Sequence, residues 1–571
     1  MPHGVLPQPG FQALILCGPG ISLNTFTSNP KEFPKALVPI ANRPMVWYPL
    51  EWCSRMGISS RTIAPYITLI TPPECKEAIE ASLSLNPHFT GLPKPEIIAP
   101  EDLTQNTPTG DIFRLPDVQE AVTGDFIVLP CDIVCELDGL SLLEEWMVQE
   151  AGLGGASGGL NDGRPLRGGI GGEKMGRRGG LGVWYPTKGQ DAIKGEETDF
   201  IATTPLSAPI VPSPCVSLRR DISKLVYAIP TDTMKDITEN GKSFPIRHSL
   251  LRKHGRIKMH TTYRDAHIYF FPYWVLEMIK RNESFDSFGE DVVGWWAKAG
   301  WQDGLGEKLD LRDILAPIQS THSDQDNGDG FPGEEEINVA SYSTTRTSNH
   351  INKEIKAIAF ASRVQDSSSP ISPRITLPST GKLEIPPILA YVQPNDPAGP
   401  IIRRVDSAAL LLNVSLRLAK LPSLHDAANK EKSSPFSHAL KIAHPDSIPV
   451  QCKVESENCL VAENVTIGER CQIKESVIGT GCTIGIGAKL IRCVVMEGAI
   501  VGEFTSLSGC ILGRRCKIEG GPRTDKEKTD LRDCEVQEGY VVPWASKFNF
   551  PQSIFRMYPL RVALLTQHTS R

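Results

Sequence analysis

Residues 10–315 alternate short apolar runs with longer stretches of mixed polarity. Two of the apolar runs, Gln12–Leu16 and Phe126–Leu129, have the length and composition of buried strands. The mixed stretches between such runs have the length of helices, as in residues 44–56. Strands that alternate with helices are typical of a largely parallel, doubly wound sheet. We therefore predict an α/β domain over residues 10–315.

A second pattern, with a period of 17 residues, occupies residues 450–519. Within each period the aliphatic side chains lie 6, 5 and 6 positions apart, and a glycine follows three of them, at positions 468, 485 and 502. This spacing predicts a solenoid with three short strands per turn, each giving one inward side chain, over residues 441–545. The expected inward columns are Val450, Ile467, Ile484, Val501 and Ile518; Ile473, Leu490 and Leu507; and Ile478, Val495 and Leu512.

The segments between and after these two patterns have a different composition. Residues 316–384 are rich in Ser, Thr, Asp, Asn, Gly and Pro, which is typical of a disordered insertion or linker. Residues 385–440 are expected to form a connecting helical segment, because Val405–Leu421 has apolar residues at helical spacing. Residues 546–571 carry no pattern from which we predict a structure.

Composition and charge exclude several classes of protein. The 571 residues have a formal net charge of −6, so nothing indicates nucleic-acid binding through bulk positive charge. No run approaches the roughly 20 apolar residues of a membrane span, and no basic signal-peptide start is evident. The 14 cysteines form no Cys-x-x-Cys pair. We therefore expect a cytosolic protein with reduced thiols, with no metal, cofactor, nucleic acid or membrane as partner.

A candidate ligand site follows the first predicted strand. Gly18-Pro19-Gly20 lies where that strand ends, which is the edge at which open α/β sheets bind ligands. Glycine allows the backbone to approach a phosphate, because no Cβ intervenes. A lone Gly-x-Gly is weak evidence for a nucleotide site. It is strengthened by Lys35, in the stretch PKALVPI, and by Asp132, which comes just after the strand Phe126–Leu129.

The stretch PKALVPIANRPM, residues 34–45, resembles the opening of sugar-phosphate nucleotidyltransferases, which release pyrophosphate as they join a sugar 1-phosphate to a nucleotide. The resemblance implies a Rossmann-like domain in which Gly18, Gly20, Lys35 and Asp132 surround a nucleotide. In that family an arginine at the position of Ser22 grips the departing phosphates, and the aspartate holds magnesium. We interpret the site here as vestigial, because Ser22 has replaced that arginine. Capping of a turn is the alternative role for Asp132.

Two further stretches bear on catalysis. Asp265-Ala266-His267-Ile268-Tyr269 resembles a family stretch whose glycine leaves room for the sugar, and His267 would fill that room. A packed, hydrogen-bonded histidine and a ligand or base are the two interpretations. Trp301-Gln302-Asp303 matches the family's Trp-x-Asp, which carries a second metal aspartate, but it comes too soon after Ile268 and we interpret it as coincidence. No catalytic residue is predicted, since loss of one preorganised cation alone typically costs 10²–10³-fold in rate.

A nucleotidyltransferase-like domain followed by a left-handed parallel β-helix of hexapeptide repeats occurs in nucleotide-sugar pyrophosphorylases and in the gamma and epsilon subunits of eukaryotic translation initiation factor 2B. The gamma-subunit family is the more similar, because RPMVWYPL at 43–50 and DAHIY at 265–269 resemble its KPLIWYPL and DAHLY. The resemblance implies a non-catalytic scaffold or accessory subunit of the complex that promotes GDP/GTP exchange on initiation factor 2. Its partners would be the other 2B subunits, especially epsilon, with initiation factor 2 as the substrate of the complex. The alternative is an active pyrophosphorylase such as mannose-1-phosphate guanylyltransferase.

Overall fold

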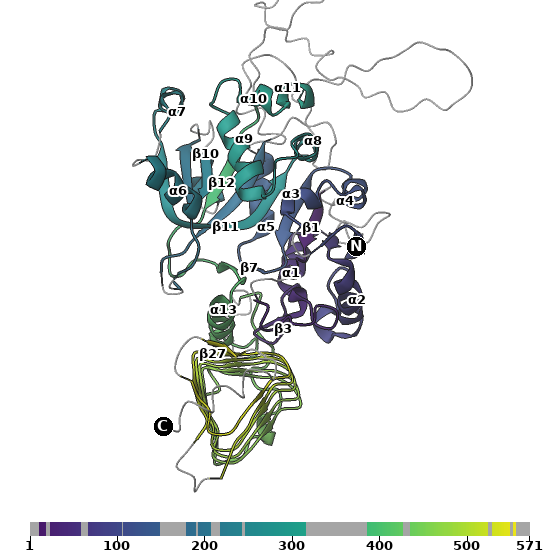
Figure 1. Ribbon diagram of the computed structural model, residues 1–571, viewed down its shortest axis with the longest axis vertical. Coiled ribbons are helices and arrows are strands. Elements are labelled where there is room, and N and C mark those ends of the chain that lie inside the picture. Colours follow the sequence, from purple (N-terminus) through teal and green to yellow (C-terminus); the bar gives the residue numbers. More distant parts are fainter. Residues whose placement is uncertain are drawn as a thin grey trace, which may run out of the picture.

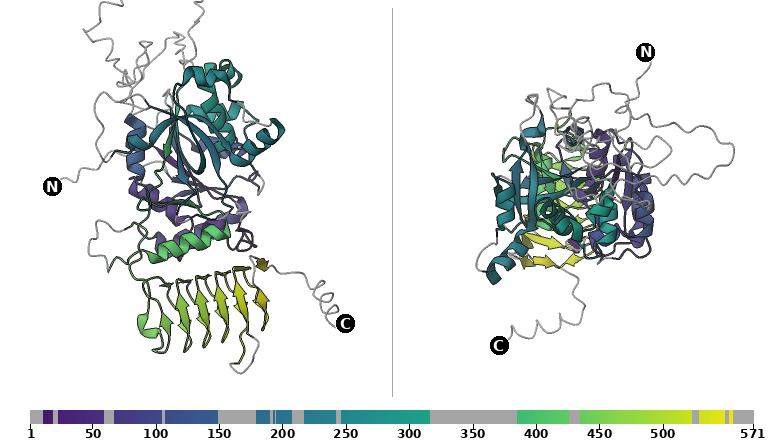
Figure 2. Two further views of the ribbon diagram at one scale, coloured as in Figure 1. Left: turned by 90° about the vertical axis from the view of Figure 1, so that its left-hand side faces the viewer. Right: turned by 90° about the horizontal axis from the view of Figure 1, so that it is seen from above.

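The computed structural model describes residues 11–18, 23–58, 67–104, 107–148, 179–189, 192–193, 195–206, 217–241, 246–315, 385–425, 434–522, 528–548 and 552–554. An α/β domain lies at one end and a triangular parallel β-helix at the other, with helix α13 (Ala408–Lys420) between them (Figures 1 and 2). The predicted fold class, a Rossmann-like α/β domain followed by a left-handed β-helix, is confirmed. Among the described residues no helix has the length and apolar character of a membrane span.

A nine-stranded sheet forms the centre of the α/β domain, in the order β5-β4-β1-β6-β11-β8-β12-β10-β9. The first four strands are parallel, but β11 runs antiparallel to both of its neighbours, β6 and β8. The prediction of a largely parallel sheet is therefore wrong for the second half. The strands are β1 (Gln12–Leu16), β4 (Ile67–Ile70), β5 (Glu96–Ile98), β6 (Phe126–Pro130), β8 (Gly180–Pro186), β9 (Asp199–Pro205), β10 (Ile222–Pro230), β11 (Lys258–Phe271) and β12 (Ile388–Val392).

Helices cover both faces of this sheet, so that successive residues of one strand enter different cores. In β1, Ala13 and Ile15 join one apolar cluster and Leu14 joins the other. This is why the strand reads as a continuous apolar run, as expected of a strand that is buried on both faces. The helices of the domain are α1 (Trp47–Arg55), α2 (Lys76–Leu85), α3 (Thr109–Ile112), α4 (Pro116–Ala121), α5 (Gly139–Trp146), α6 (Thr231–Gly241), α7 (His248–Lys253), α8 (Trp274–Arg281), α9 (Gly294–Ala299), α10 (Leu305–Lys308) and α11 (Leu311–Ile314).

The segment 385–440 is only partly the connecting helical segment that the sequence predicts. Strand β12 enters the large sheet between β8 and β10, and β13 (Ile402–Arg404) pairs with β7 (Ile133–Cys135). Only α13 supplies the expected helix. The physical reason is that β12 is apolar and almost entirely buried, which makes a central strand more favourable than an exposed connection. The α/β domain therefore continues beyond residue 315.

Three parallel sheets form the β-helix, and their strands stack with the predicted register. Ile484 lies between Ile467 and Val501, and all three are buried. The first sheet has β14 (Lys453–Val454), β17 (Gln472–Lys474), β20 (Lys489–Ile491), β23 (Ser506–Ser508), β26 (Asp530–Arg532) and β29 (Lys547–Phe548). The second has β15 (Leu460–Val461), β18 (Val477–Ile478), β21 (Val494–Val495), β24 (Ile511–Leu512), β27 (Cys534–Val536) and β30 (Gln552–Ile554). The third has β16 (Thr466–Ile467), β19 (Thr483–Ile484), β22 (Ile500–Val501), β25 (Lys517–Ile518) and β28 (Val541–Val542).

One predicted column member is wrong, because Val450 is fully exposed. It precedes β14, and the third sheet begins only at β16, so Val450 has no strand on which to stack. The glycines that follow Ile467, Ile484 and Val501 in this column have a steric role. A Cβ at Gly468 or Gly485 would lie 2.7 Å from a backbone nitrogen of the next coil. Only glycine allows the coils to stack this closely.

The second sheet of the β-helix packs against α13 and so connects the solenoid to the α/β domain. In the other two sheets the outward residues are mostly polar or exposed, but β18, β21 and β24 are buried on both faces. Their outward residues Val477, Val494 and Ile511 share an apolar core with Leu411 and Val414 of α13. One cluster therefore continues from the large sheet through α13 to the solenoid (Figure 2).

Candidate functional site

The candidate site lies at the carboxyl ends of β1 and β6, which are neighbouring parallel strands. Gly18 follows β1, and Asp132 follows β6 by two residues. Lys35 begins the 3₁₀ helix η2 (Lys35–Leu37), and its Nζ lies 2.7 Å from Oδ2 of Asp132. A Cβ at Gly18 would have no atom within 4 Å, so packing does not require glycine there. The other two predicted members of the site, Gly20 and Ser22, lie outside the described residues.

Arg404 is a member of the site that the sequence did not predict. It ends β13, and the antiparallel pairing of β13 with β7 places it opposite Ile133, next to Asp132. The Nε and Nη2 atoms of Arg404 lie 3.4 Å from Oδ1 and Oδ2 of Asp132, respectively. The backbone N–H of Val405 also donates to the carbonyl oxygen of Asp132, at 2.8 Å. No local signal could have indicated Arg404, because 272 positions separate it from Asp132.

Lys35 and Arg404 together neutralise a carboxylate that is almost completely buried. Asp132 is 1% exposed. Burial by itself would raise the pKa of its carboxyl group, but Arg404 and Lys35 outweigh burial and hold this pKa well below its usual range. Burial would likewise lower the pKa of Lys35, but Asp132 reverses that effect and raises it. All three groups are therefore charged at neutral pH. Lys35 and Arg404 supply beside Asp132 the positive charge that a bound metal ion would supply.

The contacts of the Asp132 side chain bear on its two predicted roles, which are binding of a metal ion and capping of a turn. In the described part of the chain its side chain bonds to two cations rather than to the backbone of a turn. Across β13 and β7 it faces a guanidinium group and not a second carboxylate. No group of three or more His, Cys, Asp or Glu side chains suited to a metal occurs among the residues that the structure describes. In the described part of the chain, Asp132 is therefore held in an internal ion pair with Lys35 and Arg404.

His267 is packed against the same cluster. Its backbone has a φ of 54°, in the left-handed region that glycine adopts at little cost, and it lies in an irregular stretch of β11. Its Nε2 lies 3.2 Å from Nη1 of Arg404, and its backbone N–H donates to Oδ1 of Asp265 at 2.8 Å. Burial and the neighbouring Arg404 lower the pKa of the imidazole well below its usual range. A neutral imidazole that accepts from Arg404 fits these facts, and so a packed, hydrogen-bonded histidine is the better interpretation.

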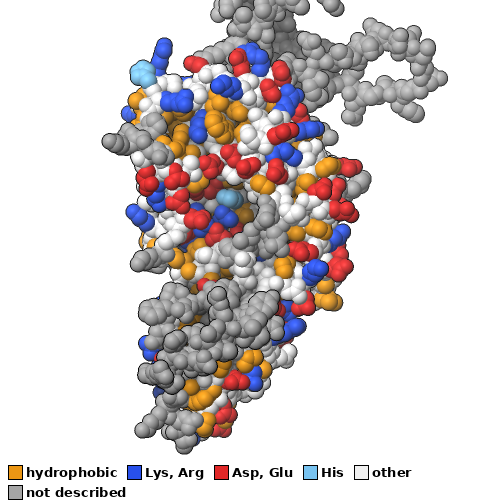
Figure 3. Space-filling view, in the orientation of Figure 1, with side chains coloured by type: hydrophobic (Ala, Val, Ile, Leu, Met, Phe, Trp, Pro, Cys, Tyr) orange, Lys and Arg blue, Asp and Glu red, His pale blue; other side chains and the backbone are white. Residues whose placement is uncertain are grey.

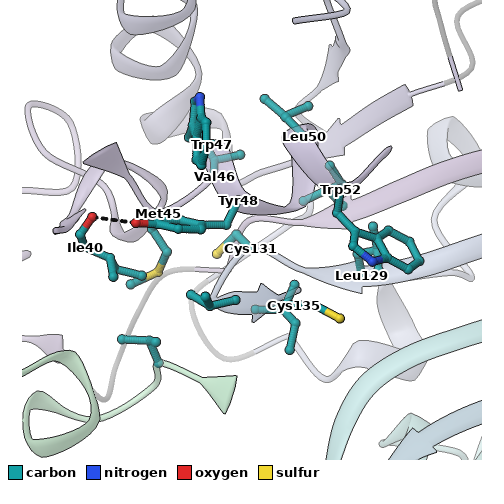
Figure 4. Close-up of a cluster of buried hydrophobic side chains, with 14 of the residues drawn as sticks. Ile40, Met45, Val46, Trp47, Tyr48, Leu50, Trp52, Leu129, Cys131 and Cys135 are labelled. Carbon is teal, nitrogen blue, oxygen red and sulfur yellow. Dashed lines mark hydrogen bonds between the residues drawn. The ribbon is translucent and has the colours of Figure 1, made fainter. Parts of the chain in front are cut away.

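Further ion pairs lie next to Arg404 and involve Asp406 and Arg264. The Arg264 side chain, also on β11, lies 2.5 Å from Asp406 and 3.3 Å from Glu197. Asp406 in turn lies 3.9 Å from Nη2 of Arg404. Tyr48 and Trp52 of α1 and Cys131, the residue before Asp132, belong to one large cluster of buried side chains (Figure 4). Trp301, by contrast, donates to the carbonyl of Val226 at 2.7 Å and packs with Leu250. Trp301 of the Trp-x-Asp match therefore belongs to a separate apolar cluster.

A pair of buried carboxyl groups beside His267 gives a testable pH dependence. Burial, with the neighbouring Asp199, raises the pKa of Asp265 to about 7, and burial raises that of Asp199 to about 6. Because the folded chain holds these protons more tightly than the unfolded chain, the contribution of this pair to stability falls as pH rises from about 4 to about 7. We expect Asp265→Asn, which cannot ionise, to lessen this fall by on the order of 2–4 kcal/mol. Urea unfolding of the natural chain and of the variant at pH 5 and pH 8 measures this difference. Identical pH dependence in the two proteins would contradict the raised pKa of Asp265.

Comparisons with known proteins agree with this architecture. Residues 455–546 match the family described as the GMPPB C-terminal domain, a class that fits the β-helix. This match covers the solenoid alone and agrees with the stacked parallel sheets that these residues form. The chain is similar to the translation initiation factor eIF2B subunit gamma of Schizosaccharomyces pombe (strain 972), with 25% identity over 331 residues. That similarity covers 58% of this chain and 59% of the relative, so it spans about three fifths of each.

Proposed function

We propose that this chain is a non-catalytic scaffold or accessory subunit of the guanine-nucleotide exchange factor that acts on translation initiation factor 2. The similarity to an eIF2B gamma subunit supports the place in translation initiation. The observation that carries the non-catalytic part is the neutralisation of Asp132 by Lys35 and Arg404. Its partners would be the other 2B subunits, especially epsilon, in the cytosol, with initiation factor 2 as the substrate of the complex.

Nucleotidyl transfer requires cations at the point where negative charge builds up on the departing pyrophosphate. Here Lys35 and Arg404 are committed to a buried carboxylate, and Ser22 replaces the family arginine. By the resemblance, His267, which is packed against Arg404, would fill the space that the family keeps open for the sugar. These three features disfavour the rival function, which is an active mannose-1-phosphate guanylyltransferase.

The solenoid offers surfaces for assembly. Its second sheet is covered by α13, but the outward residues Thr466, Thr483 and Ile500 of its third sheet are exposed. Three exposed aliphatic residues, Ile486, Ile500 and Val541, lie on or next to this sheet. A flat face of this kind suits contact with another subunit, which is consistent with a scaffold.

Native purification tests both parts of the proposal. We expect the tagged chain, isolated from its own cells, to bring down other 2B subunits that mass spectrometry identifies. The purified assembly should accelerate GDP release from initiation factor 2. The isolated chain should release no pyrophosphate from GTP with any hexose 1-phosphate, because Lys35 and Arg404 are already paired with Asp132.

An authentic guanylyltransferase serves as the positive control for the pyrophosphate assay. Recovery of the chain without other 2B subunits would contradict membership of the complex. Steady turnover of about one per second by the isolated chain would overturn the non-catalytic assignment, since this rate is within the range of ordinary enzymes.

A further inference from the structure

A groove opens on the α/β domain at the end opposite the β-helix, between α7 and α9 (Figure 1). Its cavity of about 150 Å³ is lined by apolar and aromatic side chains, among them Tyr227, Ile246, Met259, Trp295 and Trp301. Figure 3 shows apolar side chains with basic ones around them at this end of the molecule. The groove is separate from the site around Asp132, whose residues do not line it.

The groove presents apolar surface to solvent. Ile246 is 46% exposed, Met259 45% and Trp295 38%. The ammonium group of Lys298 lies 4.7 Å from the ring centroids of both Trp295 and Tyr227, which holds the two rings in place. Rigid, partly exposed aromatic side chains at the centre of a concave surface are typical anchors of a binding site.

The charges around this groove favour an acidic occupant. The charged residues that line it, Arg247 and Lys298, are both basic. Residues 246–258, which include α7, contain five Lys or Arg and no Asp or Glu, although the whole chain has a net charge of −6. Burial lowers the pKa of Lys298, and Arg247 lowers it further against the opposing effect of Glu290 and Asp291. A carboxylate placed between Arg247 and Lys298 would relieve their mutual repulsion.

An acidic segment with apolar anchors begins close by in the chain. Residues 324–337, DQDNGDGFPGEEEI, contain six carboxylates and no Lys or Arg, together with Phe331 and Ile337. The described chain stops at residue 315, just after α11, which packs on α10 and through it on α9. Eight residues, 316–323, therefore separate this point from Asp324, a reach of about 30 Å. Such a short tether gives an effective concentration in the millimolar range.

We propose that the groove between α7 and α9 binds the chain's own acidic stretch, residues 324–337. Phe331 or Ile337 fills the apolar cavity, and Glu334, Glu335 and Glu336 lie against Arg247 and Lys298. The stretch then acts as an internal ligand that any other acidic segment must displace.

Peptide binding to the full chain tests this proposal. The probe is a fluorescein-labelled peptide of residues 322–339, and its anisotropy is measured against two proteins at low salt. One is the natural chain, and the other carries a Gly/Ser sequence of equal length in place of residues 324–337. We expect the peptide to bind the replaced chain at least about tenfold more tightly than the natural chain, because the natural groove is already occupied.

Variants in the replaced chain locate the binding site. Trp295→Ala and Lys298→Glu should each weaken binding by about tenfold or more. Lys280→Glu, on the exposed end of α8, is the matched control and should leave it unchanged. A peptide with Glu334, Glu335 and Glu336 changed to Lys should bind Lys298→Glu more tightly than it binds the replaced chain.

Circular dichroism and thermal unfolding establish that each variant is folded. Failure of the peptide to bind the replaced chain would overturn the proposal, and so would binding that neither groove variant weakens. Equal binding to the natural and the replaced chain would also overturn it, because the groove would then be free to take an acidic segment of another protein.

Discussion

Replacement of Ile484 by aspartate is expected to unfold its coil of the β-helix and to remove the chain from its complex. Ile484 is 1% exposed and lies in the inward column between Ile467 and Val501. The substitution removes a buried aliphatic side chain and leaves a carboxylate without a partner in an apolar core. We expect a loss on the order of 5 kcal/mol in the free energy of unfolding of the solenoid.

The damage is expected to spread to neighbouring coils, since each coil is stabilised mainly by the coils next to it. The nine-stranded sheet has one core that contains no residue of the solenoid, and it should keep its fold. Hydrogen exchange measures the two regions separately, and a pull-down with the proposed epsilon partner measures assembly.

Lys489→Ala is the matched control for this substitution, because Lys489 is exposed on the adjacent strand β20. It should leave both exchange and recovery unchanged. Normal recovery of Ile484→Asp in the complex would contradict the proposal that the solenoid is an assembly surface.

Replacement of Arg404 by alanine is expected to destabilise the α/β domain by about 3–5 kcal/mol, because it leaves a buried carboxylate with only one of its two cations. The variant loses the contacts of the guanidinium group with Asp132, His267 and Asp406. The pKa of Asp132 should then rise toward its usual range. The stability that its ionisation contributes above about pH 4 should accordingly be smaller in the variant. Urea unfolding at pH 7 measures the first effect, and its comparison with unfolding at about pH 2, below the usual pKa of an aspartate, measures the second.

A double variant separates the ion pair from simple loss of packing. Asp132→Asn combined with Arg404→Met removes both charges, and we expect it to be more stable than the sum of the single effects by at least about 1 kcal/mol. Arg312→Ala is a matched control, because its ion pair with Glu307 is exposed and should contribute less than about 1 kcal/mol. A loss below about 1 kcal/mol for Arg404→Ala would show that Arg404 does not hold Asp132 in the way described.

The repeat pattern of the solenoid predicts its inward residues but not the contacts of its outward residues. The inward columns were predictable, because a period of 17 residues forces the same side chain into the same environment in each coil. The partner of the second sheet was not predictable. Val477, Val494 and Ile511 are as aliphatic as the inward residues, but nothing local indicates that α13 covers them. The burial of both faces of this sheet is evident only from the tertiary structure, in which α13 packs against its outward residues.

The sequence by itself determined the class of fold and the neighbourhood of the site. Apolar runs that alternate with helical stretches specify an α/β domain, and Asp132 and Gly18 follow strands whose ends meet at one sheet edge. These features depend on short-range periodicity, which a single sequence displays directly. The strand β12, the mixed direction of the large sheet and the role of Arg404 were decided only by the tertiary structure. Each depends on pairing between segments far apart in the chain, such as β13 with β7, and the energy of that pairing comes from buried contacts that no local pattern encodes.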